Sequence, residues 1–391
     1  MNTCDVVIAG GGPAGAACAW KLRQAGLDVV VIDKASFPRD KVCAGWITPQ
    51  VIEDLGLDPD DYRQGRTFQP ITAFRVGLIG VDEALDVTYA RPVSYGIRRC
   101  EFDHYLLRRS GARLVLGTPV KSIRREGGAW VVNETIRGSM LVGAGGHFCP
   151  VARMLNHTTD RAPLIAAQEV ELLIDPREAS FFNVAAEKPE LYFCRDFSGY
   201  GWCFRKEGHV NIGFGRLDPR ALPDARAEFV DFLEARHTIP ADASWRWRGH
   251  AYLLAGAPSR RAIGDGVMLA GDAAGLAYPQ SGEGIRPAIE SGLLAASTIL
   301  NAKGRYTSDR LESYENHLQR RFGVSPLARL LSRVVPGGVA AAIAQRLLDQ
   351  PWFVRHMVLD RWFLHAQEPA LTRQQAFQNA SCPEGHQQAL P

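Results

Sequence analysis

Short apolar runs that end in glycine-rich turns are the clearest hydrophobic pattern in this sequence. The run from Asp5 to Ala9 ends in the sequence GGGPAG at residues 10–15, and an alanine-rich segment extends from there to Gln24. A second apolar run, Val29 to Ile32, closes on Asp33. Short β-branched runs are typical of buried parallel strands, so the pattern predicts a strand, a helix and a second strand.

The first turn carries the spacing G-x-G-x-x-G at Gly10, Gly12 and Gly15. The first glycine permits the tight turn, the second lets the backbone approach a pyrophosphate, and the third allows close packing of helix and strand. The N-terminus of the following helix offers free N–H groups and a positive dipole end to the phosphates. Asp33 lies 18 positions after Gly15, close to the spacing of a ribose-binding carboxylate. Together these features predict a dinucleotide-binding turn.

A second glycine-rich region, far along the chain, favours a flavin over a nicotinamide cofactor. Apolar residues 267–270 are followed by a Gly-Asp pair at 271–272, and Gly282 and Gly284 lie in a loop before the small-residue apolar segment 288–300. A strand that ends in Gly-Asp can aim its carboxylate at a polyol chain. A glycine-rich loop that opens a helix can place N–H groups and a positive dipole end against the anionic reduced flavin.

Six stretches of the sequence together resemble a known enzyme family. The N-terminal fingerprint, the sequence RxxFD that begins at Arg99, the Gly-Asp pair at 271–272 and the loop PxxGxG at 279–284 resemble the p-hydroxybenzoate hydroxylase-type FAD enzymes. Within that group, FPRDKVCAG at 37–45 and GYGWCFRK at 199–206 are most similar to the geranylgeranyl reductase family.

The resemblance, which spans roughly residues 4 to 300, implies a bound FAD. It implies that Asp33 binds the ribose, that Arg99 lies near the pyrophosphate or the ribityl region, and that Asp272 binds the ribityl chain. It also implies that Cys43 lies near the flavin and the substrate, where a thiol can donate a proton. The expected FAD-binding residues are Gly10, Gly12, Pro13, Ala14, Gly15, Asp33, Lys34, Lys41, Arg99, Gly271, Asp272, Gly282, Gly284 and Ile285.

The chain departs from the family pattern at three positions. Gly145 stands where the family's GADGxxS segment has aspartate, so a carboxylate associated with pyridine-nucleotide contacts is absent. NAD(P)H is therefore only one candidate for a transient electron donor. Ala44 replaces a family glycine, and Arg205 replaces the proline after Phe204. These differences predict a substrate cavity that differs from that of the lipid reductases.

The motif-bearing segments are separated along the chain, so the sequence predicts an α/β fold with a discontinuous, Rossmann-type FAD-binding domain. Between its parts, two segments alternate between apolar and polar residues, which predicts an interleaved antiparallel β-sheet that binds the substrate. Tyr200 and Trp202 are expected to line an apolar pocket there and, with Cys43, are the catalytic candidates. The expected boundaries are 1–75, 95–160 and 250–300 for the FAD-binding domain, 76–94 and 161–249 for the substrate-binding sheet, 301–369 for a C-terminal helical region, and 370–391 for a polar tail.

The segment 318–364 predicts amphipathic helices with a basic face. It has seven arginines against two acidic residues, a local charge of +5, and the leucines and valines between 327 and 335 fall at helical spacing. Such helices either pack on the catalytic domain or make peripheral contact with an anionic membrane surface, and the sequence leaves both open.

Composition excludes several classes of protein. The 391 residues include 45 Lys and Arg against 42 Asp and Glu, a net charge of +3 that does not indicate a nucleic-acid partner. The sequence has no apolar stretch of about 18 residues and no cysteine pattern of a zinc site, so it predicts neither a membrane span nor a metal site. The absence of a signal-peptide pattern and the scattered single cysteines predict a cytoplasmic protein, peripheral to the inner face of the membrane if the basic helices make that contact.

Three functions fit the sequence. The first is a reductase that passes hydride from reduced flavin to a C=C bond of an apolar, prenyl-like or polycyclic substrate. The second is a flavin monooxygenase that hydroxylates an aromatic or apolar small molecule, and the third is a flavin-binding protein with little turnover of its own. We prefer the reductase because the loop around Cys43 and the strand from Tyr200 to Phe204 match reductases better than hydroxylases. The substrate, the electron donor and the oligomeric state stay open.

Overall fold

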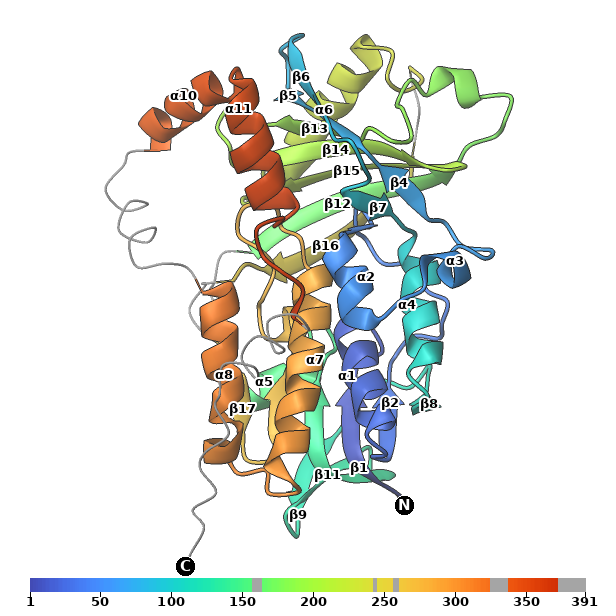
Figure 1. Ribbon diagram of the computed structural model, residues 1–391, viewed down its shortest axis with the longest axis vertical. Coiled ribbons are helices and arrows are strands. Elements are labelled where there is room, and N and C mark those ends of the chain that lie inside the picture. Colours follow the sequence, from blue (N-terminus) through green and yellow to red (C-terminus); the bar gives the residue numbers. More distant parts are fainter. Residues whose placement is uncertain (157–163, 242–244, 256–259, 324–336, 372–391) are drawn as a thin grey trace, which may run out of the picture.

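Two large β-sheets lie at opposite ends of an elongated molecule in the computed structural model (Figure 1). The structure describes residues 1–391 except 157–163, 242–244, 256–259, 324–336 and 372–391. An eight-stranded sheet with packed helices forms one end, and a seven-stranded sheet forms the other. A small sheet at their junction consists of β3 (Trp46–Ile47), β7 (Ser94–Gly96) and β4 (Gln69–Ile71).

The eight-stranded sheet contains the predicted N-terminal strands. Its members are β1 (Asn2–Ala9), β2 (Val29–Ile32), β8 (Arg113–Val115), β9 (Ile123–Glu126), β10 (Ala129–Val132), β11 (Ile136–Gly143), β17 (Ile263–Gly264) and β18 (Val267–Leu269). The order is β17-β18-β11-β1-β2-β8, with β10 and β9 continuing from β11, and β18, β11, β1, β2 and β8 run parallel. All of β2 and the second half of β1 are buried, as expected for parallel strands covered on both faces.

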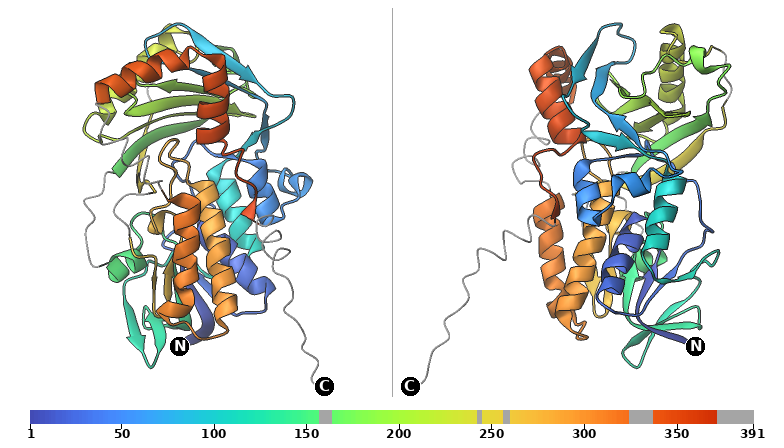
Figure 2. Two further views of the ribbon diagram at one scale, coloured as in Figure 1. Left: turned by 60° about the vertical axis from the view of Figure 1, so that its left-hand side comes forward. Right: turned by 45° about the vertical axis from the view of Figure 1, so that its right-hand side comes forward.

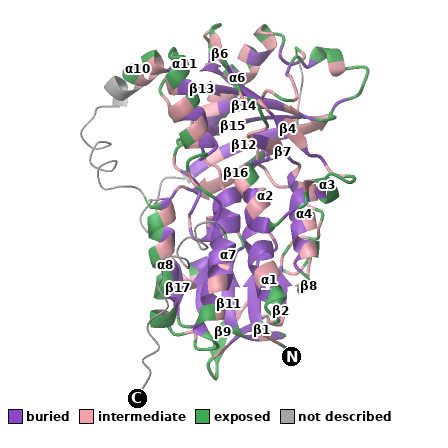
Figure 3. Ribbon diagram, viewed as in Figure 1, coloured by how far each residue is buried: buried purple, intermediate pink, exposed green. Residues whose placement is uncertain are grey.

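Helices cover this sheet and bury its apolar strands (Figure 3). They are α1 (Pro13–Gln24), α2 (Pro49–Leu55), α3 (Pro59–Tyr62), α4 (Arg99–Arg109), α5 (Pro150–Asn156), α7 (Ile285–Ala302) and α8 (Ser308–Phe322). Helix α1 packs against α4 and α7, and α8 packs against the outer side of α7. The backbones of α1 and α7 approach so closely that a Cβ at Gly292 would collide with the carbonyl oxygen of Ala14. The predicted helix 288–300 lies within α7.

The seven-stranded sheet interleaves with the other in sequence. Its strands are β5 (Ala73–Leu78), β6 (Ala84–Thr88), β12 (Leu164–Leu173), β13 (Glu190–Phe193), β14 (Gly199–Lys206), β15 (His209–Arg216) and β16 (Arg248–Leu253). They follow the order β16-β12-β15-β14-β13-β5-β6, and every neighbouring pair is antiparallel except β13 and β5. Helix α6 (Leu222–Ala235) packs on one face of the sheet, within one apolar cluster. A second apolar cluster includes residues of η3.

The sheet extends beyond the boundaries that the sequence predicts. It begins with Ala73 and ends with Leu253, whereas we expected 76 and 249. Residues 250–253, assigned above to the FAD-binding domain, pair with β12. Strand β16 therefore carries residues of the seven-stranded sheet toward the predicted cofactor site.

The C-terminal helical region divides between the two ends of the molecule. Helix α8 packs on α7, while α10 (Gly337–Leu348), α11 (Pro351–Phe353) and the π-helix η3 (Val354–Phe363) lie over the seven-stranded sheet (Figure 2). Phe363 packs there against the rings of Trp46 and Tyr200. The expected helical stretch between 327 and 335 and the tail from 372 lie outside the described residues.

Several arginines of the predicted basic face make internal contacts. Arg321 pairs with Glu290, and the guanidinium of Arg355 lies over the ring of Tyr89. In the part of the chain that the structure describes, no helix is long and apolar enough to cross a membrane. Peripheral contact with a membrane stays a prediction.

Candidate functional site

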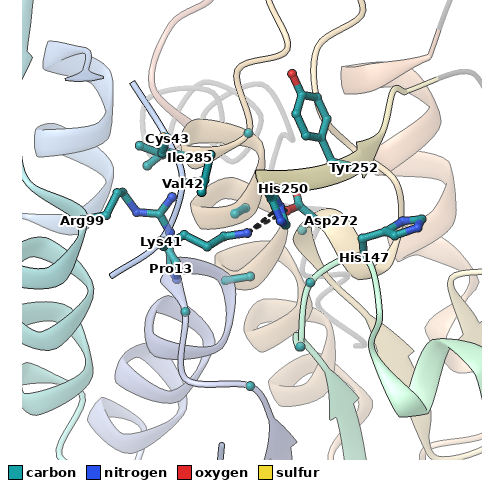
Figure 4. A pocket seen from close by; sticks show the side chains of 18 of the residues that line it. Pro13, Lys41, Val42, Cys43, Arg99, His147, His250, Tyr252, Asp272 and Ile285 are labelled. Carbon is teal, nitrogen blue, oxygen red and sulfur yellow. Dashed lines mark hydrogen bonds and ion pairs between the residues drawn. The ribbon is translucent and has the colours of Figure 1, made fainter. Parts of the chain in front are cut away.

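A cavity of about 580 Å³ lies where the two sheets meet (Figure 4). The ends of β1, β2 and β18 with the starts of α1 and α7 form one wall, and β12, β14, β16 and the loop at 41–46 form the other. The predicted site residues that line it are Gly10, Gly12, Pro13, Ala14, Asp33, Lys34, Lys41, Cys43, Arg99, Tyr200, Trp202, Gly271, Asp272, Gly282, Gly284 and Ile285. Gly15 instead packs behind the turn, where a Cβ would collide with the carbonyl oxygen of Gly10.

The turn between β1 and α1 presents the N-terminus of α1 to the cavity, and no side chain caps the N–H groups there. Gly10 has a φ of +119°, which favours glycine, and a Cβ there would collide with the backbone of Ala144. Helix α1 starts after Gly12 without a side-chain cap and without an acidic residue in its first turn. Beside it, the buried Nη1 of Arg39 has no hydrogen-bond partner among the described residues. An unpaired guanidinium donor next to a helix N-terminus fits the pyrophosphate of a dinucleotide.

Asp33 ends β2 and holds this turn in place. Its carboxylate accepts hydrogen bonds from the backbone N–H of Gly11 at 2.7 Å and of Ala35 at 2.8 Å. A carboxylate has about four acceptor positions, so Asp33 keeps the capacity to accept hydrogen bonds from ribose hydroxyl groups. Lys34, the next residue, has an exposed side chain at the edge of the cavity.

Arg99 begins α4 and is held by the aspartate of its own motif. It is 8 % exposed, and its Nε and Nη2 donate to the two carboxylate oxygens of Asp103 at 2.9 and 2.8 Å. Burial opposes the charge, but Asp103 and Cys43 outweigh burial, so the pKa of Arg99 lies above its usual value. Asp103 also pairs with Arg39 at 3.2 Å. The RxxFD motif thus fixes two guanidinium groups at the cavity.

Lys41, His250 and Asp272 meet inside the cavity (Figure 4). The Nζ of Lys41 lies 2.6 Å from Nε2 of His250 and 4.0 Å from Oδ2 of Asp272. Burial lowers the pKa of Lys41 to about 8 and lowers the pKa of His250 as well. Burial also opposes the charge of Asp272, but His250 and Lys41 outweigh it and lower the pKa of that carboxyl. Lys41 and His250 are thus hydrogen-bonded beside Asp272, and burial favours the neutral form of the imidazole.

The loop at 281–285 closes the cavity at the N-terminus of α7. Gly282 has a φ of +68°, and a Cβ there would collide with the side chain of Tyr252. A Cβ at Gly284 would lie 3.2 Å from Oδ1 of Asp272. These glycines leave the loop backbone open toward the cavity, which fits a flat ring system at the helix N-terminus.

Cys43, Tyr200 and Trp202 line the cavity from the side of the seven-stranded sheet. Burial raises the pKa of the Cys43 thiol, with Arg99 opposing the shift. The Tyr200 hydroxyl donates to the carbonyl of Ser281 at 2.5 Å, and Nε1 of Trp202 donates to Oδ1 of Asn211 at 2.7 Å. Because both polar atoms are bonded, the remaining ring surface of the two side chains is apolar.

Sequence alone did not reveal Arg39, His250 and Tyr252, which also line the cavity. Arg39 lies within the recognised stretch 37–45, so its charge was an available signal. His250 and Tyr252 alternate along β16 and thus share a face, but no motif marks them.

Two of the three departures from the family pattern reach the cavity. Gly145 and Ala44 are in its lining, and a Cβ at Gly145 would lie 3.3 Å from Sγ of Cys149. Arg205 is not in the lining, and its Nε donates to the carbonyl of Glu207. The shape of the cavity thus depends on two of these substitutions.

Known proteins resemble this chain over most of its length. A family model described as an FAD binding domain matches residues 3–322. A menaquinone reductase from Mycolicibacterium smegmatis is 30 % identical over 359 residues, 85 % of each chain. A geranylgeranyl diphosphate reductase from Rhodobacter capsulatus is 28 % identical over 311 residues, 76 % of this chain and 75 % of that protein.

Solved structures share the fold. A geranylgeranyl bacteriochlorophyll reductase-like protein from Thermoplasma acidophilum aligns with a TM-score of 0.73 at 21 % identity, covering 89 % of this chain and 91 % of that one. Halogenase PltM in complex with phloroglucinol and FAD aligns with a TM-score of 0.67 at 17 % identity, covering 93 % and 85 %. The predicted α/β architecture and the choice of FAD are confirmed. The chain belongs to the FAD-binding-domain family and is an FAD-dependent oxidoreductase related to the geranylgeranyl reductases.

Proposed function

We propose that this chain is a reductase that transfers hydride from reduced FAD to a C=C bond of an apolar, prenyl-like or polycyclic substrate. The observation that carries the proposal is the cavity wall on the side of the seven-stranded sheet, which includes Cys43, Ala44, Ala167, Tyr200 and Trp202. Reduction of a C=C bond needs one hydride and one proton. Bound FAD would supply the hydride, and the apolar part of this wall, with its one thiol, would offer dry surroundings and a proton donor.

The relatives support a reductase. The menaquinone reductase and the geranylgeranyl diphosphate reductase both align with three quarters or more of this chain. Their names describe reductions, and we transfer that reaction type to this chain as part of the proposal. The similarity to a halogenase, at 17 % identity, supports only the fold.

In this proposal, one wall binds the cofactor and the other binds the substrate. The turn at 10–15 with Arg39 and Arg99 holds the pyrophosphate, Asp33 holds the ribose, and Asp272 holds the ribityl chain. The N-terminus of α7 would lie against the flavin, where its positive dipole end would favour negative charge on the ring. On the other wall, the thiol donates the proton, and the two aromatic residues of β14 shape the substrate pocket.

The test is an anaerobic reaction that needs no biological electron donor. The holoenzyme is reduced with dithionite and mixed with prenylated quinones or prenyl diphosphates while flavin absorbance is followed. Reoxidation with a product that has gained two hydrogen atoms at a C=C bond, and that keeps them after any quinol has been oxidised back to the quinone, supports the reductase. Oxygen consumption coupled to a hydroxylated product would establish a monooxygenase instead. If no compound that perturbs the flavin spectrum reoxidises the flavin, the chain is a flavin-binding protein with little turnover.

Two further partners are part of the proposal. NAD(P)H is the candidate transient electron donor, which anaerobic reduction of the bound FAD tests. Peripheral contact with an anionic membrane would involve α10, α11 and η3, where Trp352 is 64 % exposed. Co-sedimentation with anionic and neutral vesicles, together with the fluorescence of Trp352, tests that contact.

A further inference from the structure

A buried carboxyl group lies directly behind Cys43. Glu169 is on β12, is 6 % exposed and does not line the cavity. Its Oε2 accepts the backbone N–H of Cys43 at 2.7 Å. The sheet therefore fixes a carboxyl group against the residue whose thiol lines the cavity.

Asn211 connects Glu169 to a second residue of the cavity wall. Nε1 of Trp202 is a donor only, so its bond to Oδ1 of Asn211 sets the orientation of the amide. Nδ2 of Asn211 then faces Oε2 of Glu169 at 3.3 Å and the carbonyl of Cys43 at 3.5 Å. The indole can cross β15 because Gly213 has no side chain, and a Cβ there would collide with the ring. Two cavity-lining residues thus bond to one buried network.

Burial and the charge of Lys206 act in opposite directions on the ionisation of Glu169. Lys206 is fully buried, but its Nζ lies 2.6 Å from Glu171 and also donates to two backbone carbonyls. Burial raises the pKa of Glu169 to about 7, with Lys206 opposing the shift. The ionisable groups that face Glu169 are Lys206, Glu171, Arg248 and the Cys43 thiol. A carboxyl of this kind can both hold and release a proton near neutral pH.

Two tyrosines and a glutamate of the cavity are less suited to supply protons to Cys43. Burial raises the pKa values of Tyr200 and Tyr252 above the usual value for tyrosine. The pKa of Glu283 is also raised to about 7 by burial, but its carboxylate accepts the N–H of Arg286 at the start of α7. Glu169 is the carboxyl that bonds to the backbone of Cys43 itself.

We propose that Glu169 returns a proton to Cys43 after each reduction. This inference rests on the proposed function. Hydride from reduced FAD forms one C–H bond, and the S–H bond of Cys43 breaks as its proton forms the second. The O–H bond of Glu169 then breaks to restore the thiol, and the carboxylate regains a proton from water. Glu169 is a positioning residue, because Cys43 stands between it and the substrate.

E169Q isolates this role, since glutamine keeps the size and the acceptor for Cys43 N–H but releases no proton. We expect its first turnover, measured by stopped flow with excess reductant, to stay within about twofold of wild type because Cys43 starts protonated. Later turnovers should slow by about 10- to 100-fold. E169D should restore steady turnover, and C43A should be slow from the first turnover. E190Q is the matched control, since Glu190 is a buried carboxyl of the same sheet that bonds to Tyr192.

An infrared measurement tests the proton on Glu169 without any substrate. Holoenzyme spectra at pH ~6 and pH ~8 should differ in protonated-carboxyl absorption, to which Glu169 and Glu283 both contribute; E169Q should lose the Glu169 part, and E190Q should keep both parts. Equal slowing of first and later turnovers in E169Q, or absorption that E169Q leaves unchanged, would overturn the proposal. If wild type reduces no acceptor, the proposed function fails, while loss of part of the absorption in E169Q still identifies Glu169 as a group that holds a proton.

Discussion

The two walls of the cavity are built from different kinds of structure. The wall proposed to bind the cofactor, here called the cofactor wall, consists of glycine turns and strand ends. It presents backbone N–H groups and single carboxylates at 10–15, Asp33 and 271–272. On the proposed substrate wall, Trp202 and, behind it, Glu169 are mid-strand side chains whose positions depend on the register of separate strands. The proposed cofactor wall is thus encoded locally, whereas the proposed substrate wall depends on contacts between distant segments.

Damage to the core of the seven-stranded sheet should give the largest difference between the two walls, because it should lower stability without changing the affinity for FAD. Phe204 is fully buried and packs against Trp46 at 5.9 Å between ring centroids. F204A should lower the free energy of unfolding by about 3–5 kcal/mol through the cavity it leaves. The remaining folded protein should bind FAD with unchanged affinity. Denaturant unfolding and fluorescence titration with FAD measure the two quantities.

F181A is the control, because Phe181 is 56 % exposed and its truncation should cost little stability. A large loss of FAD affinity in folded F204A would show that the walls are not independent.

The pH dependence of stability in E169Q should next isolate the contribution of Glu169, since burial also raises the pKa of Glu283 on the other wall. Burial raises the pKa of Glu169 from 4.5 to about 7, so the folded state holds a proton that the unfolded state releases. This contribution is fully present below pH 4.5 and is lost as pH rises through about 7. The loss is on the order of 3 kcal/mol. Unfolding curves of E169Q should lack this decrease relative to wild type at equal FAD concentration, and an identical pH dependence would contradict the burial argument.

Removal of a carboxylate from the cofactor wall should act on FAD rather than on the fold. D33A loses one charge-assisted hydrogen bond to Gly11 of the first turn and one to Ala35, so FAD binding should weaken by about 2–3 kcal/mol, roughly 30- to 150-fold. Equilibrium dialysis of the apoprotein with FAD measures this change. D28A is the control at the start of the same strand, where Asp28 pairs with Arg113 at 2.7 Å on the surface. Equal effects of D33A and D28A would remove Asp33 from the site.

The smallest expected effect concerns a contact between the two walls. His250 comes from the seven-stranded sheet yet contacts Lys41 near Asp272. H250Q should weaken FAD binding by about 1 kcal/mol, roughly fivefold, because one neutral hydrogen-bond partner is replaced. H317Q on α8 is the control and should leave the affinity for FAD unchanged. An unchanged affinity in H250Q as well would mean that only the cofactor wall contributes to FAD binding.

Local sequence was sufficient to predict the structure of the cofactor wall, because residues close together along the chain form each of its parts. The strand, turn and helix expected between Asp5 and Gln24 are β1, the turn at 10–15 and α1. Arg99 and Asp103 lie one helical turn apart, so their pairing follows from the spacing of the motif.

The substrate wall could not be predicted in the same way. Glu169 bonds to Cys43, which lies 126 positions earlier, and a glutamate in an alternating strand normally faces solvent. Which face of β12 is buried depends on the packing of the loop at 41–46 against it. The division of the C-terminal helices between two sheets is likewise decided by tertiary packing, because both sheets offer an apolar face.

The strand order of the larger sheet has a consequence for synthesis on the ribosome. Strand β1 emerges first, but its neighbour β11 ends at Gly143, and β18, which pairs with β11, ends at Leu269. Helix α7, which packs on α1, ends at Ala302. The turn at 10–15 therefore lacks two of its supports, β18 and α7, until about three quarters of the chain has been made. We therefore expect FAD to bind late in the maturation of this protein.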